Sequence, residues 1–297
     1  MVWHEFRTAG FVVAMKNRRY RCADGPANTL NYHYKNSELG ILCVPALGVR
    51  AAKYDRLLDA IASQGYSAGS FDLRGIGASE IRASRGVNYG YHEQIEYELP
   101  AAIDAFLETT NCKSLILFGH SIGGHISVLG QCHNIQQLKG IVVCASATVY
   151  YRNWPFPISL IALFITQMTP VISFLFGYYP GNYLGFGSKE AMRTMSDFAH
   201  TGKSGEFKLG MSDRDFLTEL KLKEIPVLAI NFKNDWYATR KGTDHLLSFL
   251  PNAKVERKSF NKFQLNLKSA SHFTWMKRPN VITATIIRWL QKHSLAE

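Results

Sequence analysis

The chain has 297 residues, of which 46% are hydrophobic and 19% charged. This composition supports one large α/β domain with an insertion and excludes a disordered or low-complexity protein. The formal net charge is +11, but the basic residues cluster only at 16–21 and 254–268. Neither cluster has the form of a nucleic-acid-binding module. We therefore interpret the charge as a basic, solvated surface and predict no nucleic-acid partner.

The cysteines and the N-terminal segment indicate the cellular compartment in which the protein is expected to work. The five cysteines form no CxxC pair and have no metal-ligand spacing. Cys43 and Cys144 lie within apolar strand-like runs, where a thiol packs as a small hydrophobic group. The apolar run near the N-terminus is only about eight residues long and has no cleavage-site pattern behind it. We therefore predict a cytoplasmic protein with no bound metal.

Strand-like and helical patterns alternate along the first part of the chain. Residues 10–22 predict an opening antiparallel hairpin. The continuous apolar run 39–44 is typical of a buried parallel strand, and apolar residues then recur at helical spacing over 51–63. The next strand is predicted at 66–71. It leads into the glycine-rich loop 72–79, which does not match a phosphate-binding motif, so we predict no cofactor.

The segment 114–124, SLILFGHSIGG, combines a buried strand, a tight turn and the start of a helix around Ser121. Residues 119–123 read G-x-S-x-G, the pattern of a nucleophile elbow in this context. A serine at positive φ projects its Oγ outward, and the flanking glycines let the strand and the helix approach closely. The N–H of Ile122 then faces the place where an oxyanion would form. The alternative is an ordinary serine in a glycine-rich turn.

The alternation continues and is then interrupted. Residues 138–145 predict another buried strand, and the next strand of this kind is 225–232. A helix near 241–249, a strand near 254–260 and a terminal helix near 280–293 follow. Strands that alternate with helices predict an α/β fold, with a mostly parallel central sheet and helices on both faces.

The interruption predicts an inserted helical cap over residues 146–212, with 1–145 and 213–297 forming the core. No charged residue occurs between Asn153 and Ser188. An uncharged insertion rich in phenylalanine, leucine, isoleucine and tyrosine suits the wall of an apolar pocket.

The apolar run 158–178 within the cap is nearly long enough to span a membrane. Thr169-Pro170 has the pattern of an N-cap followed by a proline at the first helical position, which predicts that a second short helix begins there. We favour two short helices in a soluble cap, because a span would split a continuous sheet. Peripheral contact between the apolar cap and a membrane surface remains an alternative.

Three polar residues follow the carboxyl ends of predicted strands, where functional groups of open α/β sheets lie. Ser121 follows the third buried strand, Asp235 follows 225–232, and His272 lies between the last strand and the last helix. A serine hydroxyl needs an imidazole to accept its proton, and the imidazole needs a carboxylate to orient it. The order Ser, Asp, His is the order that α/β-hydrolases use.

Other residues could take these roles. Asp235 could be a simple loop or N-cap carboxylate, while Asp213 and Asp215 lie in the return from the cap to the core. Among the histidines, His120 and His125 flank the serine and are expected to be structural or pocket-lining, and His245 lies on a helix. We prefer His272 because it lies in a serine-rich loop before the last helix.

Several stretches match a known family: PALGV and KYDRL after the first buried strand, FDLRGIGAS after the second, GHSIGG at the turn, YYPGNYLGFG in the cap and HFTW near the end. In these stretches the chain resembles serine α/β-hydrolases, most closely a branch of bacterial hydrolases related to the esterase/lipase and S33-type groups. The resemblance implies the α/β-hydrolase fold and a structural Asp72–Arg74 pair that braces the loop near the elbow.

The chain departs from that family in one loop. Many relatives carry His-Gly after the strand that leads to the oxyanion hole, whereas this chain has Pro45-Ala46-Leu47-Gly48. Oxyanion donors are backbone N–H groups, so the substitution is compatible with activity. We predict Leu47 as the second donor, with Ala46 as the alternative.

Together these features predict a serine hydrolase that works through an acyl-enzyme. Ser121 attacks the carbonyl, His272 moves the proton and Asp235 orients His272, while Ile122 and Leu47 hold the oxyanion. The expected substrate is a carboxylic ester with a small or medium apolar group. The residues expected to contact it are Ala46, His120, Phe164, Trp236 and Phe273.

The same triad serves thioesterases, aminopeptidases and acyltransferases, and the sequence does not separate these activities. An aminopeptidase needs a pocket carboxylate to hold the substrate amine, which the uncharged core of the cap disfavours. A non-catalytic binding protein with the hydrolase fold is a further alternative. The sequence makes no prediction of the oligomeric state.

Overall fold

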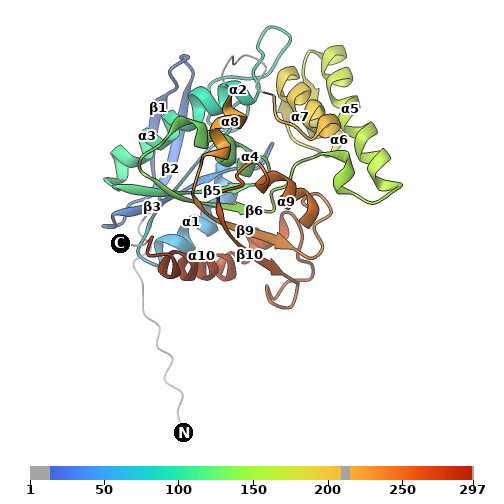
Figure 1. The fold of residues 1–297 in the computed structure, drawn as a ribbon. Helices are drawn as coiled ribbons and strands as arrows, with labels where there is room; N and C mark the ends of the chain where they lie inside the picture. The colour runs from blue at the N-terminus through green and yellow to red at the C-terminus, as the bar shows by residue number, and fades with distance from the viewer. Residues whose placement is uncertain (1–13, 209–214, 296–297) are drawn as a thin grey trace.

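A computed structural model describes residues 14–208 and 215–295 of the protein. Its centre is an eight-stranded sheet with the strand order β1-β2-β4-β3-β5-β6-β9-β10 (Figure 1). The pairs β1–β2 and β2–β4 are antiparallel, and every other neighbouring pair in the sheet is parallel. The strands are β1 Lys16–Arg21, β2 Ala27–His33, β3 Leu39–Val44, β4 Ser67–Phe71, β5 Ser114–His120, β6 Leu138–Cys144, β9 Pro226–Phe232 and β10 Lys254–Phe260.

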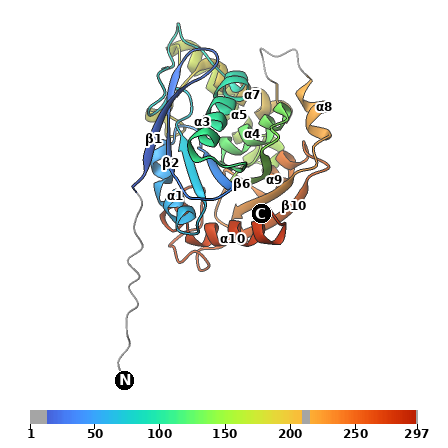
Figure 2. The same cartoon turned by 90° about the vertical axis from the view of Figure 1, so that its left-hand side faces the viewer.

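Helices cover both faces of this sheet (Figures 1 and 2). On one face, α3 (Leu99–Thr110), α4 (Ile122–Leu129), α8 (Phe216–Lys221) and α9 (Arg240–Leu247) contribute to one core cluster. On the other face, α1 (Asp55–Ala62) and α10 (Asn280–Lys292) contribute to a second cluster. Consecutive residues of the central strands alternate between the two clusters, which is why these strands are continuously apolar. The predicted fold class is confirmed.

The two basic clusters of the sequence coincide with the two edges of the sheet. β1 is almost fully exposed along its length, and β10 is mostly exposed or half-buried. Charged side chains on edge strands oppose pairing with the edge of another sheet. Residues 10–13 of the predicted opening hairpin lie outside the described residues. Within the described part of the chain, β1 and β2 form an antiparallel hairpin, and the edge position tolerates the charged strand β1.

A cap lies between β6 and β9 in the sequence and beside the core in space (Figure 1). It comprises α5 (Ile158–Phe176), β7 (Tyr179–Pro180), α6 (Gly181–Leu184), β8 (Lys189–Glu190) and α7 (Met192–Ser204). β7 and β8 pair as a small antiparallel sheet. The predicted boundary between residues 212 and 213, and with it Asp213, lies outside the described residues. Asp215 caps α8, because its Oδ1 accepts the N–H of Thr218 at 3.2 Å.

The prediction that a second helix begins at Thr169-Pro170 is wrong. α5 is one helix of 19 residues with Pro170 inside it. A proline lacks the N–H that would bond the carbonyl four residues earlier, here that of Thr166. The hydroxyl of Thr169 lies 2.9 Å from that carbonyl and 3.3 Å from the carbonyl of Met195, so its proton can serve the freed acceptor. The helix continues because this side chain compensates for the missing amide.

Replacing Thr169 with valine, which has the same shape, should lower the free energy of unfolding by about 1–2 kcal/mol, because a buried carbonyl then loses its donor. Urea unfolding followed by circular dichroism measures the change. Thr283→Val is the matched control, since the buried Thr283 hydroxyl has no hydrogen-bond partner among the described residues. Equal effects of the two substitutions would contradict the compensating role of Thr169.

Candidate active site

The turn between β5 and α4 holds Ser121 in a strained conformation. Its φ is +55° and its ψ is −121°, and its side chain is half-buried. The flanking glycines are sterically required: a Cβ on Gly119 would lie 2.4 Å from the carbonyl oxygen of Gly123, and one on Gly123 would lie 2.1 Å from that of Val44. Strain at this position aims the Oγ outward from the sheet.

His272 and Asp235 complete a continuous hydrogen-bonded chain with Ser121. The Nε2 of His272 lies 2.9 Å from the Oγ of Ser121, and its Nδ1 lies 2.9 Å from Oδ2 and 3.1 Å from Oδ1 of Asp235. Asp235 Oδ1 also accepts the N–H groups of Tyr237 and Ala238, both at 3.0 Å. An ionised carboxylate only accepts hydrogen bonds, so the proton of the neutral imidazole belongs on Nδ1. Nε2 is then free to accept the proton of Ser121.

These three residues come from distant parts of the chain and meet because their strands are parallel. Ser121 follows β5, Asp235 follows β9, and His272 lies in the loop after β10. β5, β6, β9 and β10 are consecutive in the sheet, so their carboxyl ends lie along one edge. The structure thus brings together the three side chains that the sequence analysis selected.

A second hydrogen-bonded chain lies behind the first. The N–H of Ala46 donates to the hydroxyl of Tyr54 at 2.8 Å, and that hydroxyl lies 2.8 Å from Nδ1 of His120. Nε2 of His120 lies 2.9 Å from the carbonyl oxygen of His272. The Tyr54 hydroxyl accepts from Ala46 and so donates to His120, which leaves Nε2–H to donate to His272. Burial lowers the pKa of His120 well below its usual range, in keeping with this neutral form.

This arrangement bears on the choice between two oxyanion donors. The Ala46 amide is already committed to Tyr54, so it is not the free donor that an oxyanion hole needs. Leu47, the next residue, is half-buried. A Cβ on Gly48 would lie 2.5 Å from the carbonyl carbon of Gly187, which shows that this loop packs closely against the cap. The geometry favours Leu47 over Ala46, in line with the first choice from the sequence.

Replacing Tyr54 with phenylalanine should lower kcat about tenfold with little change in KM, because the Ala46 amide and His120 both lose a partner and the oxyanion loop is held less firmly. Ester hydrolysis kinetics measure the effect. Tyr89→Phe is the control, because the buried Tyr89 hydroxyl has no partner among the described residues. A Tyr54→Phe enzyme with unchanged kcat would show that the loop needs no such support.

Comparison with known proteins identifies the family of this chain. The family model described as serine aminopeptidase, S33, matches residues 37–197, more than half of the chain and including Ser121. The chain belongs to this family. The predicted membership of the serine α/β-hydrolases is thereby confirmed, and with it the prediction of a serine hydrolase.

Relatives and solved structures extend the likeness to almost the whole chain. The monoglyceride lipase of Saccharomyces cerevisiae is 22% identical over 280 residues, which cover 86% of each chain. The structure of a soluble variant of that lipase with a substrate analog has a TM-score of 0.67 at 17% identity, covering 98% of this chain and 99% of the other. An esterase from Exiguobacterium antarcticum has a TM-score of 0.59 at 12% identity, covering 92% and 98%. These structural likenesses show a shared fold.

Within this family framework, the residues expected to contact the substrate occupy different places. Trp236 and Phe273 adjoin Asp235 and His272 in sequence and are 56% and 46% exposed, which leaves their rings open to a ligand. Ala46 is buried, next to Leu47 in the loop Pro45–Gly48. His120 is fully buried and hydrogen-bonded through both nitrogens, so it supports the triad from behind instead of lining a pocket.

Phe164 is the expected contact that the structure does not support. It lies on α5 and is 65% exposed, whereas that helix packs on α7 through its hydroxyl-bearing side chains. The prediction assumed that apolar cap residues face inward. On α5 the large apolar side chains instead face outward.

Three neighbours of the site escaped the sequence analysis. The ring of Tyr237 lies 5.2 Å from that of His272, and the indole N–H of Trp275 donates to the His272 carbonyl at 3.0 Å. Tyr54 is the third. Tyr54 and Trp275 lie within KYDRL and HFTW, two of the motifs that carried the family resemblance. Membership in these motifs was the only feature of the sequence that indicated a role for them at the site.

The other histidines that could have served as the base are bonded elsewhere. Nδ1 of His125 lies 3.1 Å from the Tyr91 hydroxyl and its Nε2 lies 2.8 Å from the Ala147 carbonyl. Burial lowers the pKa of His125 to about 4. Nδ1 of His245 lies 2.7 Å from the hydroxyl of Thr148. Both histidines are structural.

The expected pairing between Asp72 and Arg74 is wrong, although both residues brace the loop. Asp72 accepts the N–H groups of Ala51 and Ala78 through its two oxygens, at 2.7 and 2.8 Å. Arg74 makes two parallel hydrogen bonds of 2.7 Å to Asp24, in the turn between β1 and β2. Each residue thus joins the loop to a different segment.

The interior of the cap contains two carboxyl groups that we did not expect there. Glu190 accepts the N–H of Ser188 at 2.7 Å, and Asp197 accepts the N–H of Tyr91, a core residue, at 3.0 Å. Burial raises the pKa of each to about 7. Neither side chain is open to solvent, so neither is positioned to hold a substrate amine.

The raised pKa of Asp197 predicts a pH dependence of stability. Between its ordinary value of 3.8 and about 7, the folded state binds more protons than the unfolded state, so stability falls as the pH rises through this range. Asp197→Asn keeps an oxygen for the Tyr91 amide, and should reduce the loss of stability between pH 5 and pH 8 by about 2 kcal/mol. Urea unfolding at both pH values measures this, with the exposed Glu206→Gln as control. An unchanged slope in Asp197→Asn would contradict it.

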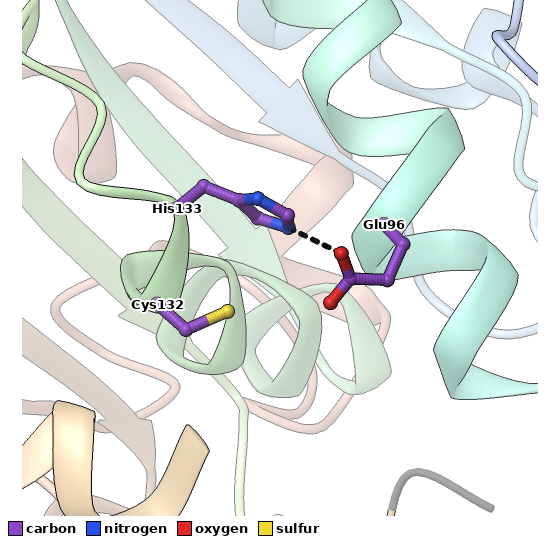
Figure 3. A group of neighbouring side chains, drawn as sticks. All are labelled: Glu96, Cys132 and His133. Carbon is purple, nitrogen blue, oxygen red and sulfur yellow. Dashed lines mark ion pairs between the residues drawn. The ribbon is translucent and has the colours of Figure 1, made fainter. Parts of the chain in front are cut away.

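One group of side chains has the composition of a metal site but lies apart from the triad. Glu96, Cys132 and His133 converge in Figure 3, with their potential ligand atoms all within 4.8 Å of one another. Cys132 and His133 follow the C-terminal end of α4, whereas Ser121 precedes its N-terminal end. Nε2 of His133 lies 3.7 Å from Oε2 of Glu96. An ion pair between these two side chains therefore explains why they lie close together. We assign this group no part in the reaction.

Proposed function

We propose that the protein hydrolyses carboxylic esters with small or medium apolar groups through a serine acyl-enzyme. The observation that carries the proposal is the continuous Ser121–His272–Asp235 hydrogen-bonded chain, in which each atom has the donor or acceptor role that the reaction requires. The esterases and the monoglyceride lipase among the similar proteins support an ester substrate.

The geometry supports the following reaction. Ser121 Oγ attacks the ester carbonyl as its proton moves to Nε2 of His272, and Asp235 stabilises the imidazolium that forms. The amides of Ile122 and Leu47 hold the negative oxygen of the tetrahedral intermediate. His272 then gives the proton to the departing alcohol, and a water molecule, deprotonated by His272, hydrolyses the acyl-enzyme. The exposed rings of Trp236 and Phe273 provide apolar surface for the substrate.

We also propose that the protein works in the cytoplasm and that its cap contacts a membrane surface. The five cysteines all lie in the described part of the chain, where they are buried and form no disulfide, which supports a reducing compartment. The membrane proposal depends on the exposed apolar side chains on the outer face of the cap.

Labelling with a fluorophosphonate probe tests the proposed nucleophile. The native protein should be labelled, Ser121→Ala and His272→Ala should not, and Ser271→Ala, which removes a hydroxyl beside His272, should be labelled as the native protein is. A panel of p-nitrophenyl esters, acyl-CoAs and aminoacyl anilides then separates esterase, thioesterase and aminopeptidase activity. Failure of the folded native protein to react, or preference for a substrate other than esters, would overturn the proposal.

A further inference from the structure

In α5, the outer helix of the cap, the polar side chains are buried and the apolar side chains are exposed, the opposite of a helix on a water-exposed protein surface. The buried side chains of α5 are the hydroxyl-bearing Thr166, Thr169 and Ser173. The helix has no charged residue, and large apolar side chains are 44–68% exposed along it: Ile158, Leu160, Ile161, Phe164, Ile165, Val171, Phe174, Leu175 and Phe176. Contiguous exposed apolar patches of this kind mark interaction surfaces.

The exposed residues form a helical face. The exposed Ile161, Phe164, Val171 and Leu175 and the half-buried Met168 lie at alternating spacings of three and four residues, which places them along one side of a helix. Within the described residues, α5 is the one helix long and apolar enough to cross a membrane, yet only 17% of its most apolar window is buried. A core helix of similar composition would be mostly buried, so the described part of the chain does not cover this face.

The opposite side of α5 is fastened to the cap by polar contacts. The side-chain amide of Gln167 donates to the carbonyl of Ala199 on α7 at 2.8 Å. A Cβ on Gly202 of α7 would lie 2.7 Å from the hydroxyl oxygen of Thr166, so the two helices pack closely. Figure 1 shows α7 between α5 and the core. Crossing a membrane would break these contacts, whereas lying along its surface would keep them.

Positive charges lie at both ends of the helix. Arg152 precedes its N-terminal end, and Lys241 donates to the Arg152 carbonyl at 2.8 Å. At the C-terminal end, Arg85 donates to the carbonyl of Leu175 at 2.9 Å, and the Nζ of Lys189 lies 4.1 Å above the ring of Tyr178. Within the part of the chain that the structure describes, none of these four cations forms an ion pair. Such a cationic margin around an apolar face complements anionic lipid headgroups.

We propose that α5 docks the protein on the surface of an anionic lipid bilayer. The helix lies in the plane of the interface, its apolar face enters the region between headgroups and acyl chains, and the four cations contact the headgroups. An apolar ester dissolved in the bilayer could then reach the enzyme without crossing water. That consequence rests on the proposed function, whereas docking itself requires no catalysis.

Vesicle flotation of the Ser121→Ala protein tests docking without turnover. The protein should float with phosphatidylcholine vesicles that contain phosphatidylglycerol, and less with phosphatidylcholine alone. Ile161→Gln/Leu175→Gln should reduce the partition coefficient about 100-fold, because two large side chains no longer enter the apolar region. Arg85→Gln/Arg152→Gln should reduce it about tenfold on the anionic vesicles only. Leu222→Gln, at a still more exposed leucine outside the cap, should have no effect.

Three results would overturn the proposal. The folded protein could fail to float with either vesicle, or the α5 variants could float as their parent does. Sedimentation could instead reveal a dimer that Ile161→Gln/Leu175→Gln dissociates, which would assign the face to a second copy of the chain. Flotation without fluorophosphonate labelling of the native protein would refute the proposed function alone, and labelling without flotation would refute docking alone.

Discussion

Replacing Asp235 with asparagine should lower kcat by about 10⁴-fold while leaving the fold intact. The carboxylate accepts the Nδ1–H of His272 through both oxygens, at 2.9 and 3.1 Å. An asparagine can present an N–H to Nδ1, which favours the tautomer with the proton on Nε2. Nε2 then cannot accept the proton of Ser121, and the charged imidazolium loses its counterion.

The measurement is the kcat of ester hydrolysis for the native protein and the variant, with circular dichroism to establish folding. Asp244→Asn is a suitable control, because Asp244 is an aspartate on α9 that pairs with Arg240 and Arg257 on the surface. It should leave kcat nearly unchanged. If Asp235→Asn retained a tenth of the native kcat, Asp235 would not be the acid of a triad.

Replacing Gly123 with alanine should prevent folding or lower the free energy of unfolding by at least about 3 kcal/mol. The added Cβ would lie 2.1 Å from the carbonyl oxygen of Val44 and 2.7 Å from that of Pro45. Both atoms belong to the backbone at the end of β3, in the centre of the sheet, so neither can move aside like a flexible side chain. The loop that carries Leu47 would have to shift with them.

Urea unfolding measures the loss of stability, and fluorophosphonate labelling reports whether the elbow survives in any folded fraction. Gly86→Ala is the matched control, because a Cβ on Gly86 meets nothing within 4 Å. Native stability of Gly123→Ala would mean that β3 and α4 can separate without cost, contrary to the close approach on which the elbow depends.

The elements that could be predicted from the sequence are those whose pattern is local. β3, β5, β6 and β9 are buried on both faces over most of their length, and such strands appear in the sequence as largely apolar runs. In a parallel sheet, the residues after these runs must meet at one edge. This is why Ser121 and Asp235 could be selected together without knowledge of their distance. His272 was selected from its place in the loop between the last strand and the last helix.

Other features depended on partners that no local pattern reveals. α5 continues through Pro170 because Thr169 can donate to the freed carbonyl. Arg74 pairs with Asp24, fifty positions away, where proximity in sequence suggested Asp72. The first depends on the conformation of one side chain, and the second on the packing of a distant turn, and a local sequence pattern determines neither.

By itself, the sequence determined the fold class, the nucleophile elbow and the candidate triad, because apolar periodicity and motif spacing are encoded within short segments. The tertiary structure alone decided that Tyr54 occupies the Ala46 amide, that Glu190 and Asp197 are buried, and that the apolar face of α5 points outward. The sequence of an uncharged helix is similar whether the helix lines a pocket or contacts a membrane. Only the side that packs on α7, through Thr166, distinguishes the two.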